Sequence, residues 1–194
     1  GLYYHYFSVN SSGPNCSFAI DRLTFNGTGM DSAQTQFHSV KPKRPKIYSY
    51  SPEADENFVK SGEVLLSKEK TASAFTAEYN FTGSGVKCIF GYIDENNYSY
   101  VETDLAAKKV RVFSVADGVA AEKGSGDIVR AYDAPDLLQT VRVAYRDGKA
   151  DVYFDDLLKI ENLGLDVGAG KFGYGGSDAT FGYTAASSVA KGLS

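Results

Sequence analysis

The stretch that decides the fold is TVRVAYRDGKADVYFDD, Thr140 to Asp156. Two alternating runs flank the pair Asp147-Gly148, which is typical of a two-residue type I′ hairpin turn. The pairs that such a turn predicts on one side of the hairpin are Val141 with Phe154, Val143 with Val152, and Tyr145 with Ala150. The pairs on the other side are Arg142 with Tyr153, Ala144 with Asp151, and Arg146 with Lys149. One side is apolar and the other mostly charged, which indicates an antiparallel sheet with a core on one face.

The composition agrees with an all-β fold. Of the 194 residues, 43% are hydrophobic and 23% charged, so the chain can bury a core. It has 14 Tyr, 12 Phe and 20 Gly but only one Met and no Trp, which favours pleated, turn-rich structure. Short strand candidates recur at 63–68, 73–81, 86–93, 98–104, 108–115, 127–133, 139–146, 150–156, 171–176 and 180–185. No long helical pattern separates them, so we expect an antiparallel β-sandwich.

Three parts follow one another along the chain. Residues 1–30 contain two strand-like runs, LYYHYFSV and SFAIDRLTFNGTG, and the polar interruption in the second predicts a bulge or bend. Residues 31–45 are polar and rich in proline, which indicates a linker, and the basic run KPKRPK at 41–46 lies in it up to its last residue. Residues 46–194 form the predicted sandwich, and Gly124-Ser125-Gly126 is expected to be a loop within it.

Charge and hydropathy limit the partners. The net charge of −4 and the pI near 5.2 argue against nucleic acid. No apolar stretch approaches the about 20 residues that cross a membrane as a helix, so we expect no membrane partner. Five glycosylation sequons indicate a secreted, extracellular glycoprotein. Their acceptors are Asn10, Asn15, Asn26, Asn80 and Asn97.

The only two cysteines are Cys16 and Cys88. They could form a disulfide in a secreted protein, or they could be two separate thiols. The sequence leaves both alternatives open, because it does not give the distance between their Cα atoms.

The larger part of the chain, about Lys46 to Ser194, resembles the concanavalin A-like (laminin G-like) β-sandwich superfamily. FGYIDENNYSYVETD followed by KKVRVFSVADG is similar to sequential strands of such modules. VRVAYRDGKADVYFDDLLKIE is similar to their late hairpin, and KFGYGGSDATFGYTAASSVAKG to their closing strands. The resemblance implies two curved antiparallel sheets in a jelly roll.

The first 30 residues carry a second resemblance. LYYHYFSV and SFAIDRLTFNGTG are similar to the last strands of the five-bladed β-propeller in family 43 glycoside hydrolases, which often carry such a sandwich on the C-terminal side. The resemblance implies that His5 matches a position facing the propeller cavity, although a lone histidine in a tyrosine-rich strand is more often a packing or surface residue. The family's catalytic carboxylates come from earlier blades, so we expect none in this chain.

The residues themselves also argue against catalysis. Glycosidase chemistry needs two carboxylates held about 5 to 9.5 Å apart across a cleft, and adjacent pairs such as Asp155-Asp156 do not meet that requirement. The two histidines, His5 and His38, lack a serine elbow motif. We therefore expect no catalytic residue here.

The residues favour sugar binding over catalysis, because aromatic faces and paired carboxylate, amide and Arg groups are the elements of carbohydrate sites. The candidates around one hairpin are Tyr92, Asp94, Asn97, Tyr98, Tyr100 and Glu102. Those expected from other strands are Arg130, Tyr132, Asp155, Tyr174 and Tyr183. Tyrosine is also a common strand residue, so each of these rings could instead be purely structural.

The sequence thus predicts a non-catalytic, carbohydrate-associated β-sandwich, with polysaccharide or oligosaccharide and an upstream catalytic propeller as partners. By resemblance, the parent glycosidase would act on arabinose- or xylose-containing plant polysaccharide. The alternative is a free-standing laminin G-like lectin or protein-interaction module, and a weaker one is an independent hydrolase of the same superfamily. Any cofactor would be a structural calcium ion held by distant loops.

Overall fold

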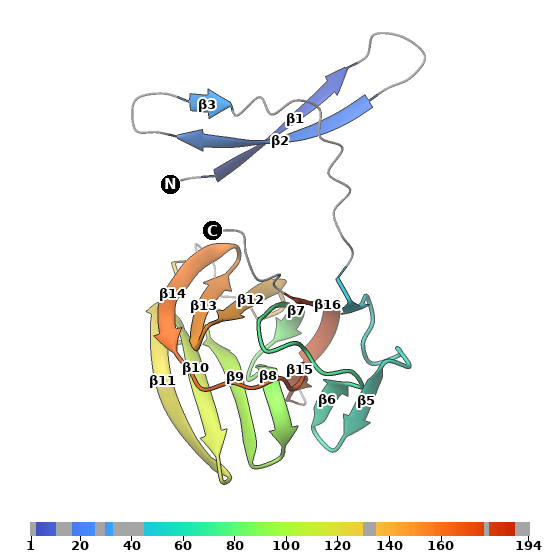
Figure 1. Ribbon diagram of the computed structural model, residues 1–194, viewed down its shortest axis with the longest axis vertical. Helices are drawn as coiled ribbons and strands as arrows, with labels where there is room; N and C mark the ends of the chain where they lie inside the picture. Colours follow the sequence, from blue (N-terminus) through green and yellow to red (C-terminus); the bar gives the residue numbers. More distant parts are fainter. Residues whose placement is uncertain are drawn as a thin grey trace. The chain divides into compact units, whose positions relative to one another are not determined.

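The computed structural model describes residues 45–129, 135–176 and 179–188, and the strand positions 3–10, 17–25 and 30–32. The chain divides into two compact units, residues 1–43 and residues 44–194 (Figure 1). The first contains a three-stranded antiparallel sheet in the order β1 (Tyr3–Asn10), β2 (Ser17–Phe25), β3 (Met30–Ser32). The pairing of β1 with β2 runs unbroken from Tyr3–Thr24 to Asn10–Ser17, so the predicted bulge is wrong. Asp31 and Ser32, expected in the linker, belong to β3.

The second unit is a sandwich of two antiparallel sheets. The seven-stranded sheet has the order β11 (Val119–Asp127), β10 (Lys109–Ala116), β9 (Asn97–Asp104), β8 (Lys87–Asp94), β15 (Lys171–Gly175), β6 (Val64–Ser67), β5 (Phe58–Ser61). The six-stranded sheet has the order β14 (Leu157–Gly164), β13 (Lys149–Phe154), β12 (Gln139–Arg146), β7 (Phe75–Gly83), β16 (Ala179–Ser188), β4 (Ile47–Ser49). The two sheets face each other as layers (Figure 1). The predicted all-β sandwich is confirmed.

The hairpin of β12 and β13 has the predicted register at all six pairs, from Val141–Phe154 to Arg146–Lys149. Asp147 and Gly148 have φ angles of 53° and 75°, both in the left-handed region that a type I′ turn requires. Val141, Val143 and Val152 are fully buried, as expected for the apolar side of this hairpin.

The core between the sheets is aromatic. Tyr79 of β7 is fully buried, and its ring centroid lies 5.5 Å from that of Tyr174 and 6.1 Å from that of Phe172, both on β15. The Tyr79 hydroxyl donates a 2.7 Å hydrogen bond to the carbonyl oxygen of Ile89 in β8. This bond satisfies a polar group that would otherwise cost free energy inside the core, and it joins the two sheets.

One strand lies where the sequence predicted a loop. Gly124 and Gly126 belong to β11. This strand contacts β14, although β14 begins 30 residues after β11 ends. A Cβ atom at Gly126 would overlap the carbonyl oxygen of Lys159 on β14, so glycine permits this close approach. The predicted strand 127–133 is wrong for Ile128 and Val129, which are not in a strand, and residues 130–133 lie outside the described residues.

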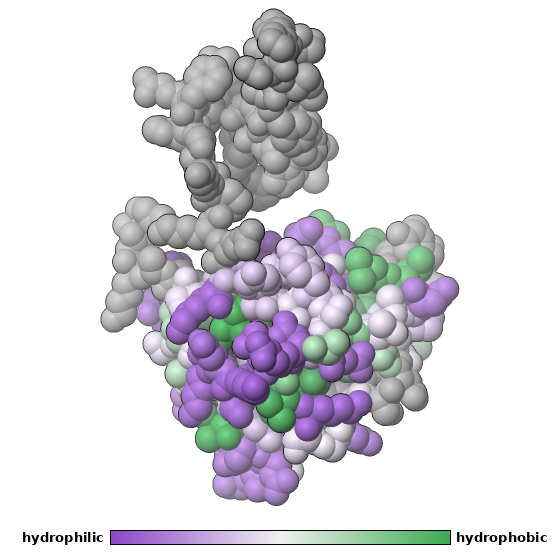
Figure 2. Space-filling model, turned by 90° about the vertical axis from the view of Figure 1, so that its right-hand side faces the viewer, coloured by the Kyte–Doolittle hydropathy of each residue, from purple (hydrophilic) through white to green (hydrophobic). Residues whose placement is uncertain are grey.

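The outer surface near β5 and β6 is mainly hydrophilic, with separate hydrophobic residues (Figure 2). Scattered apolar residues of this kind are normal on a soluble surface and indicate no site. No helix in the described part of the chain is long and apolar enough to cross a membrane.

Candidate functional site: the outer face of the seven-stranded sheet

The outer face of the seven-stranded sheet carries a hydrophobic cluster of its own. Along β9, Val101 belongs to the core, whereas Tyr98 and Tyr100 belong to this second cluster, as the alternation of a strand requires. The cluster consists of Val64, Leu66, Ile89, Tyr92, Tyr98, Tyr100, Phe113 and Val115, and we call it the aromatic face. The face of an antiparallel sheet opposite the core is ordinarily polar, so this surface is a candidate binding site.

Four rings of the aromatic face form a row across β8, β9 and β10. The ring centroids of Tyr92 and Tyr98 lie 5.6 Å apart, and those of Tyr98 and Tyr100 lie 5.9 Å apart. Tyr100 stacks on Phe113 with a centroid distance of 4.9 Å and an interplanar angle of 12°. These contacts hold the rings in place, so little side-chain entropy would be lost when a ligand binds.

A groove of about 400 Å³ runs beside this row. Its floor includes Gly175 of β15, and its walls include Val64, Lys87, Ile89 and Tyr98. A Cβ atom at Gly175 would lie 3.2 Å from Ile89 Cδ1 and 3.7 Å from Val64 Cγ1, so this glycine keeps the space between the two walls open. We call this hollow the β15 groove.

Charged groups surround the aromatic face. Lys87 Nζ lies 4.9 Å from the centroid of the Tyr100 ring, a cation–π contact. Glu102 pairs in register with both Lys87 and Arg111 on the neighbouring strands. Arg111 lies 3.6 Å from an oxygen of Asp104 and 3.8 Å from one of Glu122. Positively charged donors and negatively charged acceptors therefore border the groove and the row of rings.

Two phenols of this face, those of Tyr92 and Tyr100, have a pKa above the ordinary value of tyrosine. Burial raises the pKa of Tyr92, and the nearby Glu95 and Asp94 raise it further. Burial also raises the pKa of Tyr100, with a smaller contribution from Glu102. Tyr92 and Tyr100 therefore keep their protons, and the partly exposed Tyr92 can donate a hydrogen bond to a ligand oxygen.

Four of the predicted sugar-binding residues, Tyr92, Tyr98, Tyr100 and Glu102, come together on or beside the aromatic face. Asp94 and Asn97 lie at the β8–β9 turn, where Asn97 Nδ2 donates to Asp94 Oδ1 over 2.9 Å. This bond and one from the Asn96 backbone lower the pKa of Asp94. The hydrogen bond between Asn97 and Asp94 therefore stabilises the turn.

The structure does not bring Tyr174, Tyr183 or Asp155 to this site. Tyr174 is fully buried in the core, where burial raises its pKa, so its prediction as a sugar contact is wrong. Tyr183 belongs to β16 of the other sheet, with its ring centroid 5.3 Å from that of Tyr50. Asp155 follows β13 in the same sheet, and its Oδ1 accepts a 3.1 Å bond from the Thr140 backbone. Arg130 and Tyr132 lie outside the described residues.

Two of the predicted glycosylation acceptors have described side chains. Asn80 lies inside β7, and its Nδ2 donates a 2.8 Å bond to Thr140 Oγ1. Asn97 begins β9. Asn10 and His5 lie in β1, where only the strand is described, and His5 pairs with Arg22. Asn15, Asn26 and Cys16 fall outside the described residues.

Cys88 lies in the core at 0% exposure. Cys16 lies outside the described residues, so the bridge between Cys16 and Cys88 and the alternative of two separate thiols both stay predictions. Burial raises the pKa of the Cys88 thiol well above its ordinary value, which suppresses the reactive thiolate.

We expect Cys88 to stay unreactive toward a thiol reagent such as DTNB in the folded protein and to react once the protein unfolds. A Cys16→Ser variant should show no accessible thiol in buffer and one in denaturant. The absence of any thiol in the denatured, unreduced wild-type protein would instead demonstrate a disulfide.

Sequence reasoning missed Lys87, Ile89, Phe113 and Gly175. A signal for Ile89 was present, because CIFGYI is apolar at successive positions, which is typical of a strand covered on both faces. Gly175 alternates with the core residue Tyr174, so it was the sign of an open position on the outer face.

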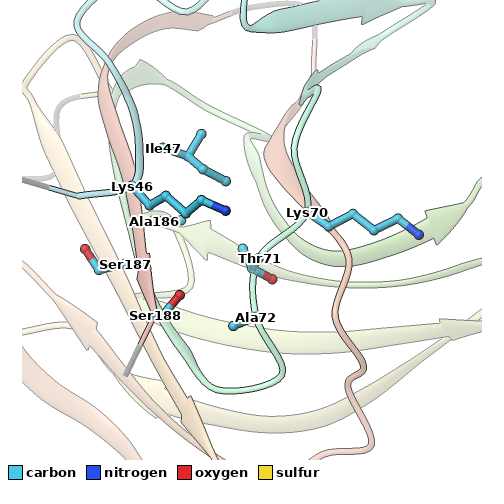
Figure 3. Close-up of a pocket in the computed structure, with 8 residues that line it drawn as sticks. All are labelled: Lys46, Ile47, Lys70, Thr71, Ala72, Ala186, Ser187 and Ser188. Carbon is cyan, nitrogen blue, oxygen red and sulfur yellow. The ribbon is translucent and has the colours of Figure 1, made fainter. Parts of the chain in front are cut away.

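A second pocket of about 260 Å³ lies beside β4 and β16 (Figure 3). The Lys46 side chain extends into it, whereas Lys70 points away. Lys46 already pairs with Glu69 over 3.4 Å, and Thr71 Oγ1 donates to the Gly170 carbonyl oxygen over 3.1 Å. Because these groups are engaged, the pocket is a weaker candidate than the β15 groove.

No group of three or more His, Cys, Asp or Glu side chains in the described residues could hold a metal ion. The structural calcium remains a prediction, since backbone carbonyl oxygens are also calcium ligands.

No protein-family model matches the sequence, and a search of the curated proteins finds no relative. Among solved structures, the carbohydrate-binding module CBM66 from Bacillus subtilis matches with a TM-score of 0.52 and 17% identity, over 68% of this chain and 88% of that one. Sheep galectin-11 in complex with glycerol matches with a TM-score of 0.50 and 9% identity, over 66% of this chain and 99% of that one.

A mutant of the GH43 protein BlXynB from Bacillus licheniformis matches with a TM-score of 0.48 and 12% identity. The match covers 90% of this chain and 47% of that one, so the chain spans about half of that protein's length. With a TM-score this low, the match carries no argument about a parent enzyme.

These matches define the class of fold. The second unit is a β-sandwich of the jelly-roll class, built from two antiparallel sheets. At identities of 17% and below, the likeness shows the fold alone.

Proposed function

We propose that the second unit is a non-catalytic module that binds a glycan chain in the β15 groove and across the aromatic face. The observation that carries this proposal is the groove itself, which has a glycine floor and lies beside fixed tyrosine rings and Lys87. Its volume of about 400 Å³ lies in the usual range of ligand sites.

The chemistry of the face suits a sugar. The C–H groups of a pyranose or furanose pack on aromatic faces, and its hydroxyl groups exchange hydrogen bonds with charged side chains. Tyr98 offers a partly exposed ring at the groove wall, and Lys87 and Glu102 offer a donor and an acceptor beside it. The names of two structural neighbours, a carbohydrate-binding module and a galectin bound to glycerol, support the same class of ligand.

Filling the groove should weaken this binding. In a Gly175→Val variant, the two added methyl groups would occupy the space between Val64 and Ile89, so we expect at least a tenfold loss of affinity, or about 1.4 kcal/mol. Tyr98→Ala should cost a similar amount. Affinity gel electrophoresis of the full chain on arabinan, xylan and galactan measures the change, and circular dichroism verifies the fold.

Thr76→Val is the matched control, because Thr76 lies on the outer side of β7 in the other sheet. It should retain wild-type affinity. If the Gly175→Val protein is folded and binds as well as the wild type, the glycan does not occupy the groove. If the wild type is retained by none of the three polysaccharides, glycan binding itself is wrong.

We further propose that the parent protein is a secreted family 43-like glycosidase acting on arabinose- or xylose-containing plant polysaccharide. Residues 2–9 and 17–29 resemble the last strands of such a propeller, and the structure places their strands in a sheet separate from the sandwich. The missing propeller would supply the catalytic carboxylates.

The mass of the intact protein from its source tests the parent proposal, and treatment with an N-glycosidase tests secretion. We expect a mass far above 20.9 kDa and a decrease on deglycosylation. A protein that begins at Gly1 would favour a free-standing lectin, and an unchanged mass after deglycosylation would contradict the glycoprotein proposal.

A further inference from the structure

A pocket of about 400 Å³ lies at one end of the sandwich. Ser99 and Ser114 line it from the seven-stranded sheet, on the side of the core residues Val101 and Val112. The segment 164–168, which follows β14, lines it from the other side. The pocket therefore opens between the two sheets, whereas the β15 groove lies on the outer face. We call it the end pocket.

Two hydroxyl groups meet in this pocket. The oxygens of Ser99 and Ser114 lie 3.0 Å apart, and Ser99 is only 4% exposed. Each hydroxyl has one donor hydrogen and two lone pairs, so their mutual hydrogen bond uses one of the two donors. The second donor has no acceptor among the residues that the structure describes. Ser114 is only partly buried and both serines line the pocket, so the remaining donor is available to a ligand oxygen.

The rest of the lining is mixed in character. Val167 provides apolar surface, and Lys123 and Asp166 provide one charge of each sign. A Cβ atom added at Gly164 or Gly168 would meet no atom within 4 Å, so open space lies beside both glycines. A site with apolar walls, hydroxyl groups and balanced charge is suited to a neutral ligand that has many hydroxyl groups.

We propose that the end pocket binds a single sugar residue, as a second site separate from the β15 groove. The Ser99–Ser114 pair exchanges hydrogen bonds with two of its hydroxyl groups, and Val167 contacts its C–H groups. Tyr98 lines both cavities and so lies between them. The proposal does not depend on binding in the groove, because the two sites differ in every other lining residue.

Free sugars test this site without any polymer. Titration of the full ¹⁵N-labelled chain with D-xylose, L-arabinose or D-galactose should give saturable amide shifts at Ser99, Ser114, Val167 and Gly168. A Ser99→Ala/Ser114→Ala protein should bind about tenfold more weakly, because it lacks the hydrogen bonds to the sugar.

A blocking variant provides a second, independent test. Gly168→Leu places a side chain in open space at the pocket, and the φ of Gly168 is not in the left-handed region, so the variant should fold. It should abolish the shifts at Ser99 and Ser114. Gly175→Val is the matched control, since it fills the groove and should leave monosaccharide binding unchanged.

The outcomes separate the two sites. Loss of the monosaccharide shifts in Gly168→Leu but not in Gly175→Val supports the end pocket. Shifts confined to residues 173–175, or no saturable shift with any of the three sugars, overturn it. A protein that binds polysaccharide through the groove while the end pocket holds only water would refute this inference and leave the proposed function intact.

Discussion

Gly173→Ala is expected to unfold the sandwich or to lower its free energy of unfolding by at least about 4 kcal/mol. Gly173 lies in β15, between Ile89 of β8 and Leu66 of β6 in the seven-stranded sheet. A Cβ atom there would overlap the carbonyl oxygen of Leu65. Because the obstructing atom is backbone, no rotamer change relieves the overlap, and β15 would have to separate from β6.

Gly175→Ala is the matched control for this prediction. It lies two residues away on the same face, but its nearest contact would be the terminal methyl of Ile89 at 3.2 Å, which can move. We expect a change within about 1 kcal/mol. Urea denaturation, monitored by circular dichroism, measures the free energy of unfolding of both variants. Equal stabilities would mean that backbone overlap at Gly173 does not limit the fold.

Gln139→Leu is expected to destabilise the protein by about 3 kcal/mol although leucine is of similar size. Gln139 is fully buried on β12, and its Oε1 accepts a 2.7 Å bond from Thr103 Oγ1 on β9. Its Nε2 donates a 2.8 Å bond to the carbonyl oxygen of Gly83. Leucine would leave the Thr103 hydroxyl without its acceptor between the sheets, where an unpaired donor is costly.

The double variant Thr103→Val/Gln139→Leu tests that cause. It removes the buried hydroxyl together with its partner, so part of the lost stability should return relative to Gln139→Leu alone. The same urea transitions give the coupling between the two positions. If the double variant loses more unfolding free energy than the two single variants lose together, the cost of Gln139→Leu comes from packing instead.

Local patterns predicted the local structure well. The Asp147-Gly148 turn fixed six cross-strand pairs because both residues adopt the left-handed conformation that these types tolerate. Local patterns were misleading where distant strands meet. Gly124 and Gly126 suggest a loop within β11, but their small size is required by contact with β14.

The candidate site was only partly predictable for the same reason. Tyr92, Tyr98 and Tyr100 belong to one hairpin, so sequence proximity placed them together correctly. Tyr174 resembles them in sequence, but the alternation along β15 directs its ring into the core. Which side of a strand faces the other sheet depends on pairing between residues far apart in the chain.

The sequence by itself determined the class of fold, because alternation and turn chemistry act over a few neighbouring residues. It also indicated that the side chains of a candidate binding site are aromatic and charged. Only the tertiary structure decided that β15 lies between β8 and β6, which makes Gly175 the floor of a groove. It also decided that Cys88 is buried and that Ser99 and Ser114 meet at the end pocket. Those arrangements arise from the burial of apolar surface between two sheets, which brings together residues that no local pattern connects.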